Sequence, residues 1–409
     1  MAHFWQGLRS GDWLTVARAR SYSLTLLGLG ALAIASWIAL SDGLVDRNGK
    51  PLGTDFSNVY AAGQLTWQGR PAEAYDPPLQ HAAEKAVFGG REVPFYGWHY
   101  PPFFLLIAFL VASLPYAAGL SIWLASSFAA YLAAMRAILP RRETALIATA
   151  FPAVFVNIGH GQNGFLTAAL LGGALHFLDR RPYLAGALIG LLAYKPQFGV
   201  LIPIALVAGG RWRTIGAAAA TMASLLALSF ATLGEGVWHA FAQSTTFTQT
   251  VVLEQGDTGW EKIQSIFSAV RMWGGGIQLA YAVQIALAIT LATSLAWLWR
   301  GDAAFELKAA ALSLASLLAT PYVLDYDLVV AGVAIAYFAR LGLRRGFRDY
   351  EISLLAVAWL APLLTRSVAQ VTAIPLALLT LLTLYVLILR RAALDRADVT
   401  ISAGKIAHA

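Results

Sequence analysis

A carboxylate early in the chain is the first candidate for chemistry. Asp55 follows Gly53-Thr54 and begins a segment whose pattern predicts a helix over residues 55–68. At the start of a helix an aspartate can be an N-cap that accepts backbone N–H bonds. It can also be a general base, if its carboxylate faces a substrate hydroxyl group. The sequence leaves both interpretations open.

Cations in unusual places form the second set of candidates. Lys195 lies between two short apolar stretches, 183–194 and 197–209. A lysine there can snorkel to the membrane surface, or its ammonium can bind a phosphate group. The predicted topology places Arg271 and Arg366 on the same side of the membrane as Lys195. Arg271 can be an interfacial residue or a phosphate ligand, and Arg366 is a further candidate for the phosphate.

Residues 157–164 hold a polar cluster between two apolar blocks. A turn explains the glycines of this segment. It does not explain His160, Gln162 and Asn163. Polar side chains at membrane depth are costly and typically face a cavity or a partner, so we expect these three to be functional.

Aromatic residues precede the second apolar block. His99 and Tyr100 lie in the segment 96–102, which can anchor the chain at the lipid headgroups or form a platform for a sugar ring. Later in the chain, Gln264 and Arg271 fall on one face of a predicted helix.

Two aspartates, Asp325 and Asp327, lie at the end of an apolar span. Carboxylates at this spacing can bind a divalent metal through oxygen, but the sequence offers no convincing third ligand. We therefore expect no metal. Bonds to sugar hydroxyl groups, or to lysine and arginine side chains, are the more economical roles.

The elements that position these residues must lie in a membrane. Of the 409 residues 58% are hydrophobic and 12% charged, with a mean hydropathy of +0.62, whereas soluble domains carry about 25% charged residues. Apolar blocks of roughly 15 to 23 residues recur along the chain. We expect an all-α polytopic membrane protein with about twelve spans. Eleven to thirteen are allowed, because 102–139 can be two elements or one broken near Pro115.

The basic residues predict the orientation, because lysine and arginine are enriched in cytoplasmic loops. Placing both termini in the cytoplasm puts 20 of the 29 basic and 9 of the 22 acidic residues on that side. The polar candidates then lie on the extracytoplasmic face of the inner (plasma) membrane. We expect one integral domain over 1–390, a first outer loop at 42–101 with short interfacial helices, a second at 234–275, and a cytoplasmic tail at 391–409.

Several function classes are excluded. Cysteine is absent, which excludes disulfides and thiolate chemistry. No run of lysine and arginine exceeds two residues and no zinc-finger or RNA-binding signature occurs, so no nucleic-acid partner is expected. No P-loop or dinucleotide fingerprint is present, so an enzyme acting on the outer face would need a donor carried by lipid.

In their order and spacing, short motifs of the chain resemble glycosyltransferase family 87, of the GT-C superfamily of membrane glycosyltransferases. Known members are polyprenyl-phosphate-mannose-dependent mannosyltransferases. The resemblance implies a GT-C fold and inverting transfer of a sugar, expected to be mannose, from a polyprenyl-phosphate donor to a lipid or glycan acceptor. It covers roughly residues 50–330 and rests on Asp55-Phe56, Tyr60, Tyr100-Pro101-Pro102, Gly161-Gln162-Asn163, Lys195-Pro196, Arg211-Trp212-Arg213, Gln264-Ser265, Arg271 and Pro321.

The resemblance also implies roles for the candidates. Asp55 would be the general base, and Lys195, Arg271 and Arg366 would bind the donor phosphate. No cofactor is expected, and the partners are the donor, the acceptor and membrane lipids. The residues expected to bind the sugar or the acceptor are Tyr60, His99, Tyr100, His160, Gln162, Asn163, Gln264, Asp325 and Asp327.

Two other classes fit part of the pattern. Broken helices with polar groups are also typical of transporters and lipid flippases. A polymerase or ligase with a lipid-pyrophosphate donor would share the outer loop and the cations. The polar groups gather on one face rather than near the midplane, and no convincing internal repeat is found, which favours the transferase over the transporter.

Overall fold

The computed structural model describes residues 2–407, and every regular element in that range is a helix. Seven helical segments are long and apolar enough to cross a membrane. The prediction of an all-α polytopic membrane protein is confirmed, while the count of about twelve spans stays a prediction. The seven are α2 (Val16–Ala39), α6 (Tyr116–Ile138), α12 (Trp212–Leu233), α15 (Ile277–Arg300), Asp325–Arg345 formed by η6 (Asp325–Val330) with α17 (Ala331–Arg345), α18 (Glu351–Thr372), and Leu376–Asp398 within α19 (Leu376–Ala407).

Shorter helices fill the other apolar blocks. Prolines begin α8 (Pro152–His160), α10 (Pro182–Leu191) and η4 (Pro196–Gly199), where their missing N–H would have no helical partner anyway. The break at Lys195 lies inside the protein, which is where a membrane protein tolerates irregular backbone. These helices are α7 (Thr144–Thr149), α8 (Pro152–His160), α9 (Gly164–Phe177), α10 (Pro182–Leu191), η3 (Leu192–Tyr194), η4 (Pro196–Gly199), α11 (Ile202–Ala208) and α16 (Phe305–Leu318).

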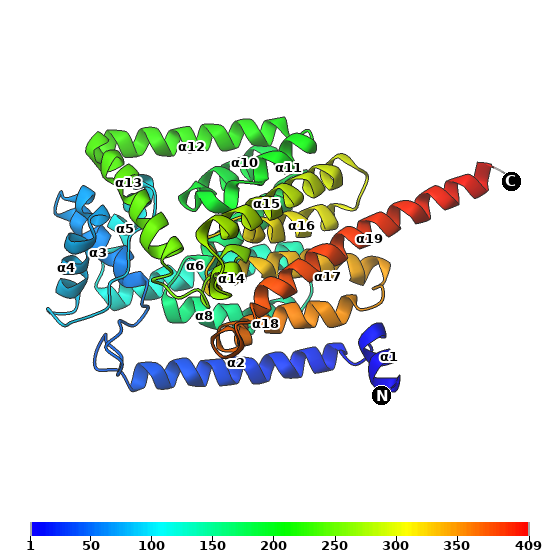
Figure 1. The fold of residues 1–409 in the computed structure, drawn as a ribbon, viewed down its shortest axis with the longest axis horizontal. Helices are drawn as coiled ribbons and strands as arrows, with labels where there is room; N and C mark the ends of the chain where they lie inside the picture. The colour runs from blue at the N-terminus through cyan, green and yellow to red at the C-terminus, as the bar shows by residue number, and fades with distance from the viewer. Residues whose placement is uncertain (1, 408–409) are drawn as a thin grey trace.

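The two predicted outer loops also form short helices. Those of the first loop lie beside α5 (Leu105–Val111) and α13 (Glu235–Phe247) at one end of the bundle (Figure 1). The expected break near Pro115 is present, because α5 ends at Val111 and α6 begins at Tyr116. The helices of the two loops are α3 (Phe56–Trp67), η1 (Pro71–Tyr75), α4 (Pro77–Val87), α13 (Glu235–Phe247), the π-helix η5 (Thr248–Glu254) and α14 (Ile266–Met272). Between the first loop and α6 lie η2 (Pro102–Phe104) and α5 (Leu105–Val111).

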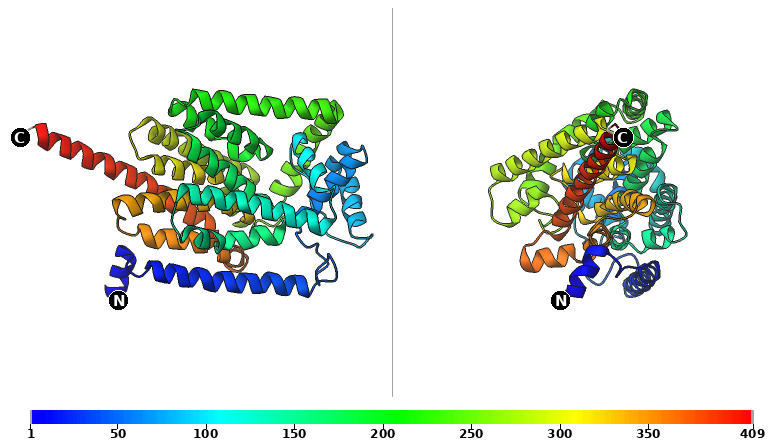
Figure 2. Two further views of the ribbon diagram at one scale, coloured as in Figure 1. Left: turned by 180° about the vertical axis from the view of Figure 1, so that it is seen from behind. Right: turned by 90° about the vertical axis from the view of Figure 1, so that its right-hand side faces the viewer.

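The opposite end of the bundle carries α1 (Ala2–Ser10) and the C-terminal part of α19 (Figures 1 and 2). Ion pairs join segments that the charge distribution assigns to the cytoplasm. Arg9 Nε lies 2.7 Å from Asp349 Oδ2, and Arg344 Nη1 lies 2.5 Å from Glu306 Oε1. Both ends of the described chain lie at this end of the bundle (Figures 1 and 2). That this end faces the cytoplasm stays a prediction.

Close packing of α3 on α5 holds the helix that follows Asp55. A Cβ built on Gly63 would lie 2.2 Å from the carbonyl oxygen of Ala108. Gly63→Ala is therefore expected to destabilise the protein by about 1–3 kcal/mol, because backbone must move. Thermal unfolding of the detergent-solubilised protein measures the effect. Gly28→Ala on α2, where nothing lies within 4 Å, is the control, and equal melting temperatures for the two variants would contradict the prediction.

Candidate active site

Asp55 lies in a turn that packs against the end of α8. Its backbone N–H donates to the carbonyl of His160 at 3.0 Å. Gly161 ends α8 in the left-handed conformation, with φ 62°. A Cβ on Gly161 would lie 2.7 Å from the Cβ of Phe56, so glycine lets the two segments approach. The site is thus assembled from segments far apart in the sequence.

Three side chains hold the carboxylate of Asp55. Gln162 Nε2 donates to Oδ2 at 3.0 Å, Thr54 Oγ1 donates to Oδ1 at 3.4 Å, and His160 Nδ1 lies 3.7 Å from Oδ1. The carboxylate makes no capping bond to α3, so the N-cap interpretation is wrong. The Asp55 side chain keeps 15% of its area exposed.

The charges of Asp55 and His160 stabilise each other. Burial alone would raise the pKa of Asp55, but the His160 ring and the bonds from Gln162 and Thr54 lower it below 3.8. Burial also opposes protonation of His160, but the Asp55 carboxylate raises the pKa of the ring above 6.5. The protonated ring can donate from Nδ1 to Thr54 Oγ1, 2.9 Å away. Asp55 is therefore ionised at neutral pH.

Gln162 is the centre of a polar network. Its Nε2 also donates to the Tyr326 hydroxyl at 3.2 Å, and its Oε1 accepts from the Tyr100 hydroxyl at 3.1 Å and from the N–H of Asn163 at 3.0 Å. Asn163 Nδ2 donates to the Tyr100 oxygen at 2.7 Å. These bonds fix the Gln162 amide so that its N–H group faces Asp55.

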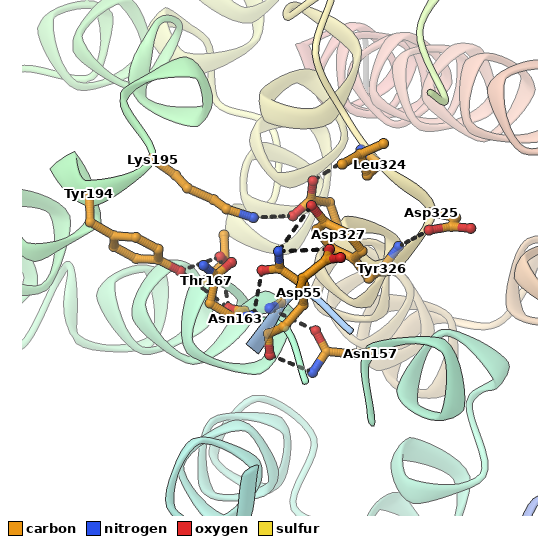
Figure 3. Close-up of polar contacts among 12 residues, drawn as sticks. Asp55, Asn157, Asn163, Thr167, Tyr194, Lys195, Leu324, Asp325, Tyr326 and Asp327 are labelled. Atoms are coloured by element: carbon orange, nitrogen blue, oxygen red, sulfur yellow. Dashed lines mark hydrogen bonds and ion pairs between the residues drawn. The ribbon is translucent and has the colours of Figure 1, made fainter. Parts of the chain in front are cut away.

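Lys195 and Asp327 form an ion pair inside the protein. Nζ lies 2.6 Å from Oδ1, and the two side chains keep 5% and 4% of their areas exposed. The ammonium also lies 5.2 Å from the centre of the Tyr326 ring, which places the pair beside the network around Gln162 (Figure 3). Because Lys195 is buried and paired, its interpretation as a snorkelling lysine is wrong.

Asp325 and Arg366 form a second, more open pair, with Nη1 3.7 Å from Oδ2. Asp325 also acts on the His160 ring and favours its protonation. Gln264 holds the segment before Asp325, because its N–H donates to the carbonyl of Val323 at 2.7 Å and its Oε1 accepts from a threonine of α18 at 2.8 Å. Both acids thus pair with cations, one of the roles expected from the sequence.

Three candidates make their contacts elsewhere. Tyr60 is buried, and its hydroxyl donates to a carbonyl just before α6 at 2.8 Å. His99 Nδ1 lies 2.7 Å from the hydroxyl of Thr248, and burial lowers the pKa of this histidine to about 4. Arg271 donates to two carbonyls of its own loop and lies 4.9 Å from the Trp260 ring. Within residues 2–407 these three share no hydrogen bond or ion pair with the clusters above.

Thr54, Tyr326 and Asn157 belong to the site but were not predicted. Asn157 Nδ2 donates to the carbonyl of Gln162, and its Oδ1 accepts from the N–H of Gly164, so it shapes the loop that carries the amides. The signal was present, because each of these residues lies inside a polar motif of the sequence. Over the described residues, no group of three or more histidine and acidic side chains is placed to hold a metal ion.

Comparison with known proteins adds one finding to this geometry. The sequence model of glycosyltransferase family 87 matches residues 98–321, a little over half of the chain. Comparisons with curated proteins and with solved structures found no match. The matched region includes His160, Gln162 and Lys195, whereas Asp55 and Asp325 lie outside it.

Proposed function

The chain belongs to glycosyltransferase family 87, and from this premise we propose that it moves mannose from a polyprenyl-phosphate donor to a lipid or glycan acceptor. The observation that carries the proposal is the Asp55 carboxylate. It is held by Gln162 and His160, it has no capping role, and it keeps part of its surface exposed. That arrangement suits a general base better than a structural residue.

In the proposed reaction the acceptor hydroxyl oxygen attacks the anomeric carbon of the sugar. The bond from this carbon to the phosphate oxygen breaks, and the polyprenyl phosphate leaves with the bonding electrons. Asp55 accepts the proton of the hydroxyl group. A single displacement of this kind inverts the anomeric carbon, and it needs no cofactor.

Lys195 and Arg366 are proposed to stabilise the charge that develops on the leaving phosphate. Lys195 donates one ammonium N–H to Asp327. This bond orients the ammonium group and leaves its other two N–H groups available to the phosphate. Arg366 holds Asp325 only at 3.7 Å, so its guanidinium can turn to an anion. Arg271 stays a third candidate, which would have to exchange its loop carbonyls for the phosphate.

The network around Gln162 is proposed to bind the sugar. Asn163 Oδ1 is buried and has no hydrogen-bond partner among the described residues, so it can accept a hydrogen bond from a sugar hydroxyl group. We place the site on the extracytoplasmic face of the plasma membrane, because the arginine-rich segments lie at the other end of the bundle.

The test is transfer by the purified protein in detergent, given radiolabelled polyprenyl-phosphate mannose and a membrane-lipid extract. A labelled glycolipid supports the proposal. A product made only from a lipid-pyrophosphate donor would favour a polymerase or ligase. No product from any sugar donor, together with substrate-dependent flux into proteoliposomes, would favour a transporter.

His160→Asn is expected to move the acid limb of the turnover–pH profile to higher pH. The pKa of Asp55 is lowered, so the stability that its ionised carboxylate contributes is lost as pH falls through that pKa, below 3.8. The pKa of His160 is raised, so the stability that its protonated ring contributes is lost as pH rises through that pKa, above 6.5. The pair is intact between these limits. Without the ring, Asp55 takes up a proton at higher pH.

At pH 7 the His160→Asn variant is expected to lose no more than about tenfold in turnover, because Asp55 is still ionised there. Initial rates across the pH range measure both effects. His239→Asn, at an exposed position of α13, is the matched control. An acid limb that stays in place would contradict the pairing.

A further inference from the structure

A second carboxylate lies behind Asp55 and takes no part in the reaction above. Glu84 belongs to α4, and none of its surface is exposed. Its Oε1 lies 3.3 Å from Ser57 Oγ, and its Oε2 accepts the backbone N–H of Tyr96 at 3.1 Å. A carboxylate buried without a cation is costly, unlike a neutral acid with hydrogen bonds.

The hydrogen bonds of Ser57 indicate where the proton lies. Ser57 has a single hydroxyl proton, and its nearer acceptor is the carbonyl of Thr54, at 2.7 Å. A carbonyl oxygen can only accept, so the proton is used there. The contact between Ser57 and Glu84 is then a hydrogen bond only if Glu84 donates, which requires a protonated carboxyl group.

The surrounding charges favour the same state. Burial raises the pKa of Glu84 to about 8 and the nearby Asp55 carboxylate adds to this, against the bond from the backbone N–H of Tyr96. The ionisable side chains that face Glu84 are Asp55 before α3, Tyr96 at the end of the loop and Tyr116 on α6. None of them is a cation. Two neighbouring carboxyl groups with pKa values pushed apart can take different roles.

We propose that Glu84 is a positioning residue for Asp55 that acts as a neutral carboxylic acid, donating to Ser57 and accepting from Tyr96. The first bond continues through Ser57 to the carbonyl of Thr54, the residue before Asp55. The second ties α4 to the end of the first loop. Together they hold the Asp55 turn from behind, and the inference rests on the proposed function in taking Asp55 as the base.

Glu84→Gln tests the protonation state without an activity assay, because the amide keeps a donor and an acceptor but cannot ionise. The pKa of folded Glu84 is raised, so its contribution to stability is complete below about pH 4.5 and is lost as pH rises through about 8. The melting temperature of Glu84→Gln should therefore exceed that of the wild type by a gap that grows across this range.

The control is Glu235→Gln, which changes an exposed glutamate of α13. Its melting curve should follow the wild type at every pH. A Glu84→Gln curve that runs parallel to the wild type would overturn the inference, because Glu84 would then be ionised in the folded protein.

Turnover separates positioning from folding. Glu84→Gln is expected to stay within about threefold of the wild type at pH 7, because its hydrogen bonds are kept. It should also keep more of its turnover above pH 8, where wild-type Glu84 ionises. Glu84→Leu keeps neither bond and is expected to lose about tenfold or more, because a displaced base is ineffective.

A folded Glu84→Leu variant with wild-type turnover would overturn the positioning role. The Gln variant keeps the test decisive if the Leu variant does not fold. The two proposals can fail separately: an active Asp55→Asn variant would refute the proposed base, whereas a pH-independent melting gap for Glu84→Gln would refute the neutral acid.

Discussion

Asp55→Asn is expected to lower turnover by about 10²–10⁴-fold while the protein stays folded. The amide oxygen can still accept the bond from Gln162 Nε2, so the turn keeps its main contact. The amide cannot take the proton of the acceptor hydroxyl. The substitution also removes the negative charge that keeps the pKa of His160 raised despite burial, so the pKa of that ring falls. The site then loses a cation as well as its base.

Initial rates of sugar transfer measure the effect, and Asp42→Asn is the matched control. Asp42 lies in the same loop, 84% exposed and 2.8 Å from Arg91. Such exposed pairs contribute at most about 1 kcal/mol, so this variant should keep wild-type turnover and melting temperature. Turnover of Asp55→Asn above about a tenth of the wild type would rule out the base, because general-base effects are larger.

Lys195→Met is expected to lose stability and turnover together. It leaves Asp327 buried without its cation, and breaking a buried pair in this way costs about 3–5 kcal/mol. Lys85→Met makes the same substitution in a pair whose Glu92 side chain is 82% exposed, and should cost about 1 kcal/mol or less. Thermal unfolding of the two variants measures the difference.

Combining Lys195→Met with Asp327→Asn separates stability from chemistry. The amide needs no counter-ion, and its oxygen can still accept the N–H of Leu324, so most of the stability should return. Turnover should stay about 10²–10³-fold below the wild type, because the Lys195 ammonium no longer stabilises the negative charge on the leaving phosphate. Wild-type turnover in the double variant would show that Lys195 serves only the fold.

The arrangement of helices in a membrane could be predicted because it depends on local composition. Apolar blocks such as α2 and α12 must leave water wherever they lie in the chain, and clusters of arginine favour one side. The ion pairs Arg9–Asp349 and Arg344–Glu306 join segments that this charge distribution had already placed together. The number of spans was harder, because proline-interrupted helices near Lys195 are too short to count by length.

The residue types of the site could be predicted, whereas their contacts could not. His160 was expected to bind the sugar or the acceptor, and the structure places its ring 3.7 Å from Asp55. Lys195 was expected to meet a phosphate, and the structure pairs it with Asp327 at 2.6 Å. Which charged side chains meet depends on which loops pack against each other. That packing is determined partly by contacts outside the site, such as that of Gly63 with Ala108.

Composition and helical periodicity predict a helical membrane protein with Asp55 at the start of a helix, because both act over a few neighbouring residues. Only the folded structure shows that the Asp55 carboxylate makes no capping bond to α3 and is paired with His160. It alone placed Glu84 behind that carboxylate, with none of its surface exposed. Burial, and the proton that burial imposes, depend on atoms brought together from distant segments.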